Sequence, residues 1–236
     1  MQNTAFVTGA DRGVGFALSA ALLQRGWRVS AGQYMPEWHE LATLSSQFPK
    51  LLHIVQLDVS SMESVQAAAR TVAETTDQID LLINNAGILQ EYGELRTGLD
   101  SVAMHRTFDV NVLGVIRVVE AFLPFMDRGM RRLVFLSTDN SSIAMLRIQG
   151  RFGYCMSKTA LNMAVKIMFN HLRPEGYTFR LYHPGWVRAY VLGYKNMKAN
   201  MEPEEGAEKA MPILLENRDD EDRLVMIDCF GREWPF

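Results

Sequence analysis

Short apolar, β-branched runs alternate along the chain with longer segments whose apolar residues recur at helical spacing. The strand-like runs are residues 4–8, 27–32, 51–57, 79–84, 132–137, 179–183 and 224–227. The helical segments are residues 14–25, 36–48, 61–76, 102–126, 154–173 and 204–216, and an S-x-x-E capping box at Ser60 and Glu63 marks the start of the third. Strands separated by helices need parallel crossovers. The pattern therefore predicts an α/β fold: a doubly wound, mostly parallel seven-stranded sheet with helices on both faces.

Two segments fit neither pattern, and no repeat or linker divides the chain. They are residues 90–100 and the stretch from Val187 to Pro203, which mixes aromatic residues, lysines and methionines. In α/β enzymes such loops usually lie over the carboxyl ends of the strands, where ligands bind. We therefore predict a single domain over residues 1–236, with the second loop as its substrate loop.

Composition and charge narrow the classes of function. The 236 residues are 48% hydrophobic and 22% charged, as in an ordinary globular domain. Basic residues number 24 and acidic residues 27, so the excess of cations that a nucleic-acid partner needs is missing. Cys155 and Cys229 stand outside any disulfide or metal-ligand pattern, and no metal is expected. Since neither a leader pattern nor an apolar span is found, we predict a cytoplasmic protein without a membrane partner.

A glycine-rich turn follows the first predicted strand and opens the first helix, with the sequence Thr8-Gly-Ala-Asp-Arg-Gly-Val-Gly15. Glycines allow a tight turn, and the helix N-terminus that follows favours the negative charge of a pyrophosphate. A plain strand-to-helix turn is the alternative, because the glycine spacing alone is weakly specific. In this context the turn predicts a dinucleotide site in a Rossmann-type fold.

Tyr154 and Lys158 stand at positions i and i+4 of a predicted helix and therefore project from the same face. An ammonium about 4 Å from a phenol lowers the phenol pKa by about three units at an effective dielectric constant of about 20, provided that the site excludes water. A phenol tuned in this way exchanges a proton with a carbonyl or alcohol oxygen. The alternative is a surface tyrosine beside a solvated lysine.

These motifs stand with several others in the order typical of the short-chain dehydrogenase/reductase family, which the sequence resembles over nearly its whole length. The others are Asp58-Val59, Asn84-Asn-Ala-Gly87, Val110-Asn-Val112 and His183-Pro-Gly-Trp-Val187. Residues 154–163, 183–187 and 231–235 resemble the C-factor-type carbonyl reductase branch in particular. The resemblance implies an oxidoreductase that transfers a hydride between a nicotinamide cofactor and a small carbonyl or alcohol substrate.

By this resemblance Tyr154 is the catalytic acid and base, Lys158 holds the nicotinamide ribose and lowers the tyrosine pKa, and Asn111 anchors a water in the proton relay. The resemblance also implies which residues bind the cofactor; besides Tyr154 and Lys158 they are Gly9, Arg12, Gly13, Val14, Gly15, Gln33, Asp58, Val59, Asn84, Ala86, Gly87, Pro184, Gly185 and Val187. For Asp58 the plain alternative is a cap, and for Asn84 a strand-end turn. His183 is expected to support the strand end rather than to act in catalysis.

Two positions depart from the family pattern. The hydroxyl that polarises the carbonyl is usually the second of a Ser-Ser pair, which here reads Ser137-Thr138, whereas the usual spacing from Tyr154 (154 − 13 = 141) gives Ser141. A strand end is a firmer platform than a loop, so we rank Thr138 ahead of Ser141 and Ser142. Arg188 stands where the family often has a threonine that touches the nicotinamide amide, and it is expected to face an anionic group.

The residues expected near the 2′ position of the cofactor favour NADP(H), with NAD(H) as the alternative. NAD-specific members place a carboxylate at the end of the second strand, and here that place is Gln33. Arg12 stands where NADP-preferring members often carry a basic residue, and a guanidinium can pair a phosphate through two donors. Against this, Glu37 lies close by and no second cation follows the strand. A solvated Arg12 is the alternative.

Two further expectations concern activity and assembly. A non-catalytic, dinucleotide-sensing protein of the same fold is the alternative to an enzyme, although such proteins typically lose the Tyr/Lys pair. A homodimer or homotetramer is expected through the helices at 102–126 and 154–173. The second helix carries Leu161, Val165, Met168 and Phe169 on an apolar stripe, which can equally face the protein's own sheet.

Overall fold

The computed structural model describes residues 2–90 and 93–236, and its centre is one eight-stranded sheet with the order β10-β9-β8-β7-β4-β1-β2-β3. The strands are β1 (Thr4–Val7), β2 (Arg28–Gln33), β3 (Leu52–Gln56), β4 (Leu81–Asn84), β7 (Arg132–Leu136), β8 (Thr178–His183), β9 (Met226–Asp228) and β10 (Glu233–Trp234). Neighbouring strands pair in parallel, except that β10 pairs antiparallel with β9. The predicted α/β class with a mostly parallel sheet is confirmed.

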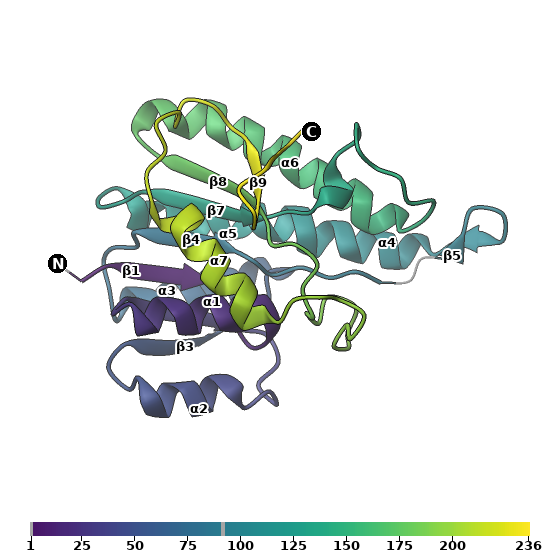
Figure 1. Cartoon of the computed structure of the whole chain (residues 1–236). Helices are drawn as coiled ribbons and strands as arrows, with labels where there is room; N and C mark the ends of the chain where they lie inside the picture. The colour runs from purple at the N-terminus through teal and green to yellow at the C-terminus, as the bar shows by residue number, and fades with distance from the viewer. Residues whose placement is uncertain (1, 91–92) are drawn as a thin grey trace.

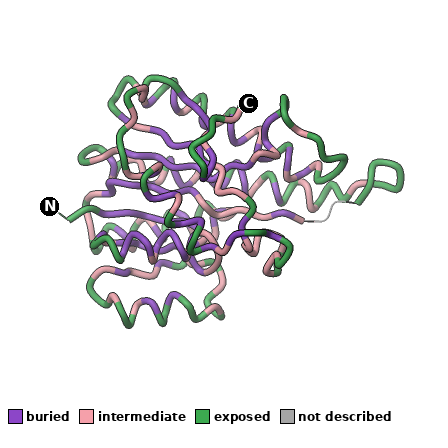
Figure 2. The backbone as a smooth tube through the Cα atoms, in the orientation of Figure 1, coloured by how far each residue is buried: buried purple, intermediate pink, exposed green. Residues whose placement is uncertain are grey.

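Helices cover both faces of this sheet, as Figure 1 shows. They are α1 (Gly13–Gln24), α2 (Glu40–Gln47), α3 (Met62–Ala73), α4 (Ser101–Phe108), α5 (Gly114–Phe122), α6 (Phe152–Leu172) and α7 (Pro203–Leu215). The buried side chains form two clusters: one joins the sheet to α1, α2 and α7, and the other joins it to α3, α5 and α6. Figure 2 shows the same division, with buried strands between partly exposed helices. In the part of the chain described, no helix combines the length and the apolar character that a membrane crossing requires.

Several boundaries differ from the prediction. The sheet has an eighth strand, since β10 is two residues long and too short to show a periodic pattern. Within the segment 90–100, Gly93–Glu94 (β5) and Gly98–Leu99 (β6) form a separate antiparallel hairpin, while residues 91 and 92 lie outside the described residues. The helix predicted at 102–126 is interrupted by a π-helical turn at Asp109–Leu113 and ends in a 3₁₀ turn at Leu123–Met126.

The cap of α3 is also displaced by one residue. Ser61, not Ser60, accepts a hydrogen bond from the backbone N–H of Ser64 at 3.2 Å. Ser60 instead donates its hydroxyl proton to Asp58 Oδ1 at 2.6 Å, and the Ser60 backbone N–H donates to the same oxygen. The carboxylate of Asp58 therefore competes successfully for Ser60, and the capping-box prediction is wrong at this position.

The connections place a crevice in the middle of the sheet. From β1 the chain proceeds to β2 and β3 on one side, and then crosses back to β4, β7, β8 and β9 on the other. In such sheets ligands bind outside the carboxyl ends of the strands where the order reverses. Here that position lies between β1 and β4, next to the turn that precedes α1.

At the opposite end of the sheet, two buried arginines hold the segment that follows α7. Arg132 on β7 and Arg180 on β8 are 0% and 2% exposed. Arg180 makes a two-pronged ion pair with Glu221 at 2.6 and 2.8 Å, and Arg132 lies 3.7 Å from the same carboxylate. The guanidinium of Arg132 also donates to the carbonyl oxygens of Leu214 and Glu216. Buried polar contacts thus attach the segment 214–221 to the sheet, together with the apolar packing of Leu214.

Candidate active site

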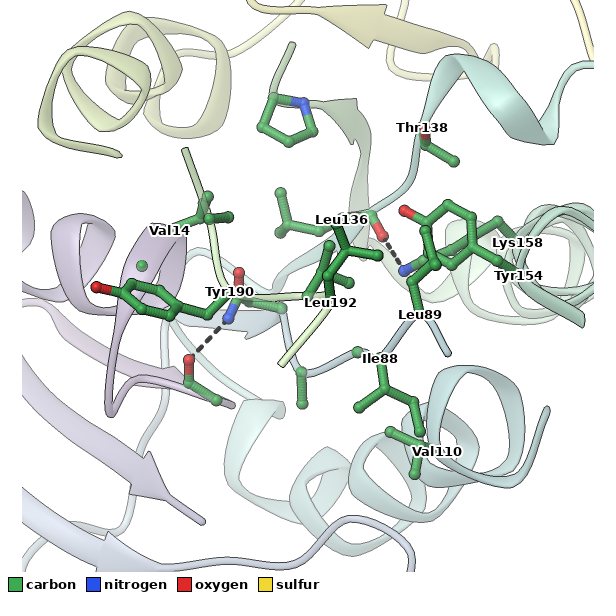
Figure 3. A pocket seen from close by; sticks show the side chains of 18 of the residues that line it. Val14, Ile88, Leu89, Val110, Leu136, Thr138, Tyr154, Lys158, Tyr190 and Leu192 are labelled. Carbon is green, nitrogen blue, oxygen red and sulfur yellow. Dashed lines mark hydrogen bonds between the residues drawn. The ribbon is translucent and has the colours of Figure 1, made fainter. Parts of the chain in front are cut away.

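A cavity of about 560 Å³ opens at the carboxyl ends of β1, β4, β7 and β8 (Figure 3). Most of the residues predicted for the site line it together: Gly9, Arg12, Gly13, Val14, Asp58, Val59, Ala86, Gly87, Thr138, Tyr154, Lys158, Pro184, Gly185 and Val187. Gly15, Asn84, Asn111 and Ser141 are buried behind its wall. The fold therefore brings segments from six parts of the chain to one cavity.

The glycine turn is held by the end of β4. Thr8 Oγ1 accepts hydrogen bonds from the backbone N–H groups of Asn85 and Ala86, each at 3.0 Å. Asn85 Nδ2 donates in return to the carbonyl oxygens of Thr8 and Gly9 at 2.9 Å. Gly9 has a φ of +61°, a conformation that favours glycine. These bonds fix the turn at the end of the cavity next to α1.

The start of α1 has the properties of an anion site. The helix has no side-chain cap on its first N–H groups and no acidic residue in its first turn. Gly13, in the first turn, has no side chain between its backbone and the cavity. Unsatisfied N–H groups and the helix dipole both favour a phosphate at this position. The residues present therefore fit the pyrophosphate of a dinucleotide.

Around the expected 2′ position, Arg12 is already engaged by its neighbours. Its Nη1 donates to Asp11 Oδ2 at 2.7 Å and to Met35 Sδ at 2.8 Å, and its guanidinium lies 4.9 Å from the Trp38 ring centroid. Gln33 does not point at the cavity, because its Nε2 donates to the carbonyl oxygen of Trp38 at 3.2 Å. Asp11 lines the cavity and is the carboxylate that the sequence prediction overlooked, having weighed only Glu37.

Tyr154 and Lys158 stand on one face of α6, but their electrostatics differ from the prediction. Burial raises the pKa of Tyr154 to about 12, against the opposing effect of its hydrogen bond with Thr138. Burial also lowers the pKa of Lys158 to about 8, and its Nζ donates to the Leu136 carbonyl oxygen at 2.8 Å, as the dashed line in Figure 3 shows. The pKa of Tyr154 is thus raised, and Lys158 is not among the groups that shift it, so the predicted lowering of the tyrosine pKa by Lys158 is wrong. Desolvation outweighs the attraction that the i, i+4 spacing suggested.

Of the three candidate hydroxyls, Thr138 alone lines the cavity among the residues that the structure describes. Ser141 is 1% exposed and its Oγ donates to the Thr138 carbonyl oxygen at 2.6 Å. Ser137 and Asn162 complete a buried network around Ser141, with hydrogen bonds of 2.7 to 3.1 Å. Ser142 is fully buried. The network supports Thr138 from behind, and among its members Ser137 also lines the cavity.

Asn111 lies in the π-helical turn and is fully buried. Its Nδ2 donates to the Ile88 carbonyl oxygen at 2.9 Å and to Ser157 Oγ at 3.0 Å, while its Oδ1 accepts from the Ile88 N–H at 2.8 Å. The side chain is thus committed to joining the end of β4 to α6. Oδ1 accepts one hydrogen bond and has a second lone pair, so the predicted water at Asn111 stays a prediction.

The loop from Val187 to Pro203 crosses the cavity. The ring of Tyr190 packs edge-on against Trp38 at 4.8 Å, and the Leu89 N–H donates to the Val191 carbonyl oxygen at 2.8 Å. Figure 3 shows Tyr190 and Leu192 between the α1 side and the Ile88 side of the cavity. Arg188 faces an anionic group of the protein itself, because its Nη1 pairs with Glu202 Oε1 at 2.6 Å.

The cavity also contains polar residues that the sequence prediction did not assign. Asp139 follows Thr138, and Arg106 and Arg151 come from α4 and from the residue before α6. His183 is nearly buried, and burial is the main cause of its lowered pKa. Its ring packs edge-on against Trp234 of β10, so its supporting role at the strand end stays a prediction that this contact favours. Only Asp139 carried a sequence signal, its position directly after the Ser-Thr pair.

Comparison with known proteins identifies the family. Residues 3–200 match the family model described as short chain dehydrogenase. An uncharacterised oxidoreductase of Schizosaccharomyces pombe is 36% identical over 186 residues, which are 78% of this chain and 73% of that protein. The C-signal protein of Myxococcus xanthus is 44% identical over 119 residues, 50% of this chain and 71% of C-signal.

A solved structure gives the same result. The NADPH-bound carbonyl reductase from chicken fatty liver is 26% identical and superposes with a TM-score of 0.88, with 100% of each chain covered. The resemblance that the motifs predicted, including the one to the C-factor-type branch, is confirmed by these matches. The chain belongs to the short-chain dehydrogenase/reductase family.

Proposed function

We propose that the protein is an NADP(H)-dependent oxidoreductase of the carbonyl reductase or alcohol dehydrogenase type. The observation that carries this proposal is the placement of Tyr154, Lys158 and Thr138 on the wall of the same cavity that begins at the glycine turn. A proton donor and a hydroxyl thus stand together beside a site that fits a dinucleotide. The NADPH-bound carbonyl reductase that shares the fold supports the same type of activity and the same cofactor.

Each part of the cavity then has a task. The glycine turn and the start of α1 hold the pyrophosphate, and Asp58 and Val59 hold the adenine. Ala86 and Gly87 lie beside the adenine-side ribose, and Pro184, Gly185 and Val187 beside the nicotinamide. When bound, the nicotinamide supplies or accepts the hydride. Tyr154 gives a proton to the substrate oxygen or takes one from it, and Thr138 donates a hydrogen bond to that oxygen. Lys158 is placed to hold the nicotinamide ribose.

Replacement of the tyrosine tests the mechanism. Tyr154→Phe keeps the ring and removes the proton, so turnover should fall by roughly 10² or more while NADPH binding persists. Tyr194→Phe is the matched control, because Tyr194 is 61% exposed. Turnover and NADPH binding are measured side by side on a panel of aldehydes and ketones. Unchanged turnover in Tyr154→Phe refutes the mechanism, and NADPH binding without reduction of any carbonyl favours a dinucleotide sensor instead.

The preference for NADP(H) rests on Arg12. Among the described residues, the Arg12 side chain donates hydrogen bonds to Asp11 and Met35, both through Nη1, so Nη2 and Nε stay available for a 2′-phosphate. Arg12→Ala should raise the KM for NADPH much more than the KM for NADH. Arg25→Ala, at the far end of α1, should change neither. A wild-type protein that uses NADH better at equal concentration overturns the assignment.

Location and assembly are proposed on narrower grounds. The free, buried thiols of Cys155 and Cys229 suit a reducing cytoplasm. The stripe predicted for assembly faces inward, because Leu161, Val165 and Phe169 are buried in the core and Met168 packs against it. A homodimer or homotetramer through α4, α5 and α6 would therefore use their outward apolar side chains, among them Val102, Met163 and Ile167.

A further inference from the structure

Two arginines stand on the wall of the cavity without a task in the proposed function. Arg106 on α4 and Arg151, directly before α6, both line the cavity, and both are exposed. With the other described residues, neither side chain makes a hydrogen bond or an ion pair. Arg12 of the same wall, in contrast, pairs with Asp11. Each guanidinium has five N–H donors in a fixed fork, so both arginines can meet a ligand that enters the cavity.

The packing of α4 and α6 brings the two arginines to the same level. These helices follow the parallel neighbours β4 and β7, pack together and run in the same direction (Figure 1). The hydrogen bond from Asn111 Nδ2 to Ser157 Oγ aligns these two positions. Arg106 stands five residues before Asn111 (111 − 106 = 5) and Arg151 six before Ser157 (157 − 151 = 6), which is about 7 to 9 Å along each helix. Tyr154 lies between the two levels, so both arginines stand on its outer side.

The backbone of Arg151 and its effect on Tyr154 give a second observation. Arg151 has a φ of +58° and a ψ of 39°, a left-handed conformation that residues other than glycine rarely adopt. Such backbone strain occurs often at ligand sites. Burial is the main cause of the raised pKa of Tyr154, and the cation of Arg151 acts against it. Arg151 is therefore close enough to act electrostatically on the proton donor.

Apolar side chains lie next to Tyr154 on the same wall. Figure 3 shows Leu89 beside the Tyr154 ring, with Ile88 and Val110 below. Val110 stands four residues after Arg106, and both line the cavity, so an apolar and a cationic side chain follow one face of this helix. A ligand that reaches from the phenol to the arginines therefore meets apolar contacts between its two polar ends.

One carboxylate on this wall acts against an anionic ligand. Asp139 lines the cavity, and its side chain is 45% exposed. Its Oδ1 lies 3.9 Å from His183 Nε2, on β8. Within the part of the chain that the structure describes, it forms no ion pair with Arg106 or Arg151. The charges of the two arginines are therefore not neutralised by the protein.

We propose, on the basis of the function proposed above, that Arg106 and Arg151 form an anion subsite that selects carbonyl substrates carrying a carboxylate beyond an apolar spacer. These substrates are oxo acids, and their reduced products are hydroxy acids. The carbonyl carbon accepts the hydride of the reduced nicotinamide, and the carbonyl oxygen accepts the Tyr154 proton, which solvent then replaces. The carboxylate keeps its charge throughout and accepts hydrogen bonds from the two guanidinium groups.

A pair of substrates that differ in charge and little in shape tests the subsite. These are 4-carboxybenzaldehyde and its methyl ester, each measured by NADPH consumption. Arg106→Gln and Arg151→Gln should each lower the ratio of kcat/KM for the acid to kcat/KM for the ester by about three- to tenfold. The fall should come mainly from a higher KM for the acid. Because the ratio compares two aldehydes on one variant, a changed pKa of Tyr154 affects both and leaves the ratio unaltered.

Two further variants give the experiment its controls. Arg147→Gln removes an exposed cation from the same loop, four residues before Arg151 (151 − 147 = 4), and Arg147 is not among the described residues of the cavity wall. It should leave the ratio unchanged. Asp139→Asn removes the opposing charge and should raise the ratio by about two- to threefold. A ratio equal to that of the wild type in both Arg106→Gln and Arg151→Gln overturns the proposal.

A binding measurement separates this inference from the proposed function, because it needs no turnover. Benzoate, a carboxylate without a carbonyl carbon to reduce to an alcohol, is titrated into each protein and followed by NMR. It should bind the wild type and Arg147→Gln about three- to tenfold more tightly than Arg106→Gln or Arg151→Gln. Equal affinity in all four proteins refutes the anion subsite. Arginine-dependent binding of benzoate by a wild type that reduces no aldehyde supports the subsite and refutes the proposed function.

Discussion

Alanine at Gly15 tests whether the glycine turn is built for close backbone approach. Gly15 lies in the first turn of α1, and a Cβ there would lie 2.2 Å from the Gly9 carbonyl oxygen and 2.4 Å from Asn85 Nδ2. Ordinary contact begins at 3.4 Å, so the Gly9 carbonyl would have to retreat by 1.2 Å (3.4 − 2.2 = 1.2). Because that oxygen belongs to the backbone of the turn, the whole turn must move.

The magnitude follows from three contributions. Overpacking in a close-packed region costs about 1–3 kcal/mol. The displaced carbonyl weakens its 2.9 Å hydrogen bond from Asn85, which costs about 1 kcal/mol more. Alanine is the better helix former by about 1 kcal/mol and offsets part of this loss. The free energy of unfolding of Gly15→Ala should therefore fall by about 1–3 kcal/mol, and NADPH binding should weaken by about tenfold or more, since the turn lines the cavity.

The assay combines urea denaturation, followed by the fluorescence of the four tryptophans, with NADPH titration. Gly26→Ala is the matched control at the other end of α1. Its φ of +78° makes alanine unfavourable by about 1–2 kcal/mol, but a Cβ there would meet no heavy atom within 4 Å. Gly26→Ala should therefore bind NADPH like the wild type. If Gly15→Ala binds NADPH as tightly as Gly26→Ala, the glycine turn does not need the close approach that we infer.

Other substitutions test the hydroxyl, the buried ion pair and the assembly. Thr138→Val should lose more turnover than Ser141→Ala in steady-state assays, because Thr138 lines the cavity and Ser141 is buried behind it; the opposite order would transfer the role to Ser141. Glu221→Gln leaves two buried arginines without their carboxylate and should lower the free energy of unfolding by about 3–5 kcal/mol in urea. The pKa of Glu221 in the folded protein lies below its ordinary value of 4.5, so its stabilisation is present above that pH and is lost as the pH falls. The difference in the free energy of unfolding between Glu221→Gln and the wild type should therefore become smaller as the pH falls below 4.5. A difference that grows in acid contradicts the stabilising ion pair assigned to Glu221. Light scattering at micromolar concentration should show a dimer or tetramer that Ile167→Glu weakens, and a monomeric wild type counts against the assembly.

The sequence predicted the fold well where a long pattern repeats. Every long strand was found because its middle is mostly buried and rich in apolar residues, and alternation with helices implied the parallel sheet. Most of the predicted cofactor residues line the cavity for the same reason, since they follow strand ends that a parallel sheet brings to one edge. Short or local features were less predictable. The two residues of β10 are too few to show a periodic pattern. Which of Ser60 and Ser61 caps α3 depends on the carboxylate of Asp58, which accepts a hydrogen bond from Ser60.

The sequence predicted where the site residues lie, but it did not predict the direction in which the pKa of Tyr154 is shifted. The spacing of Tyr154 and Lys158 correctly places both on the cavity wall, yet the sign of the tyrosine pKa shift depends on how far the wall excludes water and on where each polar atom finds its partner. Lys158 donates a hydrogen bond to the Leu136 carbonyl oxygen, a contact that the spacing of residues in the sequence does not indicate.

The wall therefore disfavours charge on both residues, because burial raises the pKa of Tyr154 and lowers that of Lys158. A neutral phenol and a lysine with a pKa of about 8 need a further polar partner before their charges become favourable together. Ribose hydroxyls beside Lys158 would supply such a partner, since they can accept from its ammonium group. The pKa values of both residues thus depend on how far the cavity wall excludes water as well as on their polar neighbours.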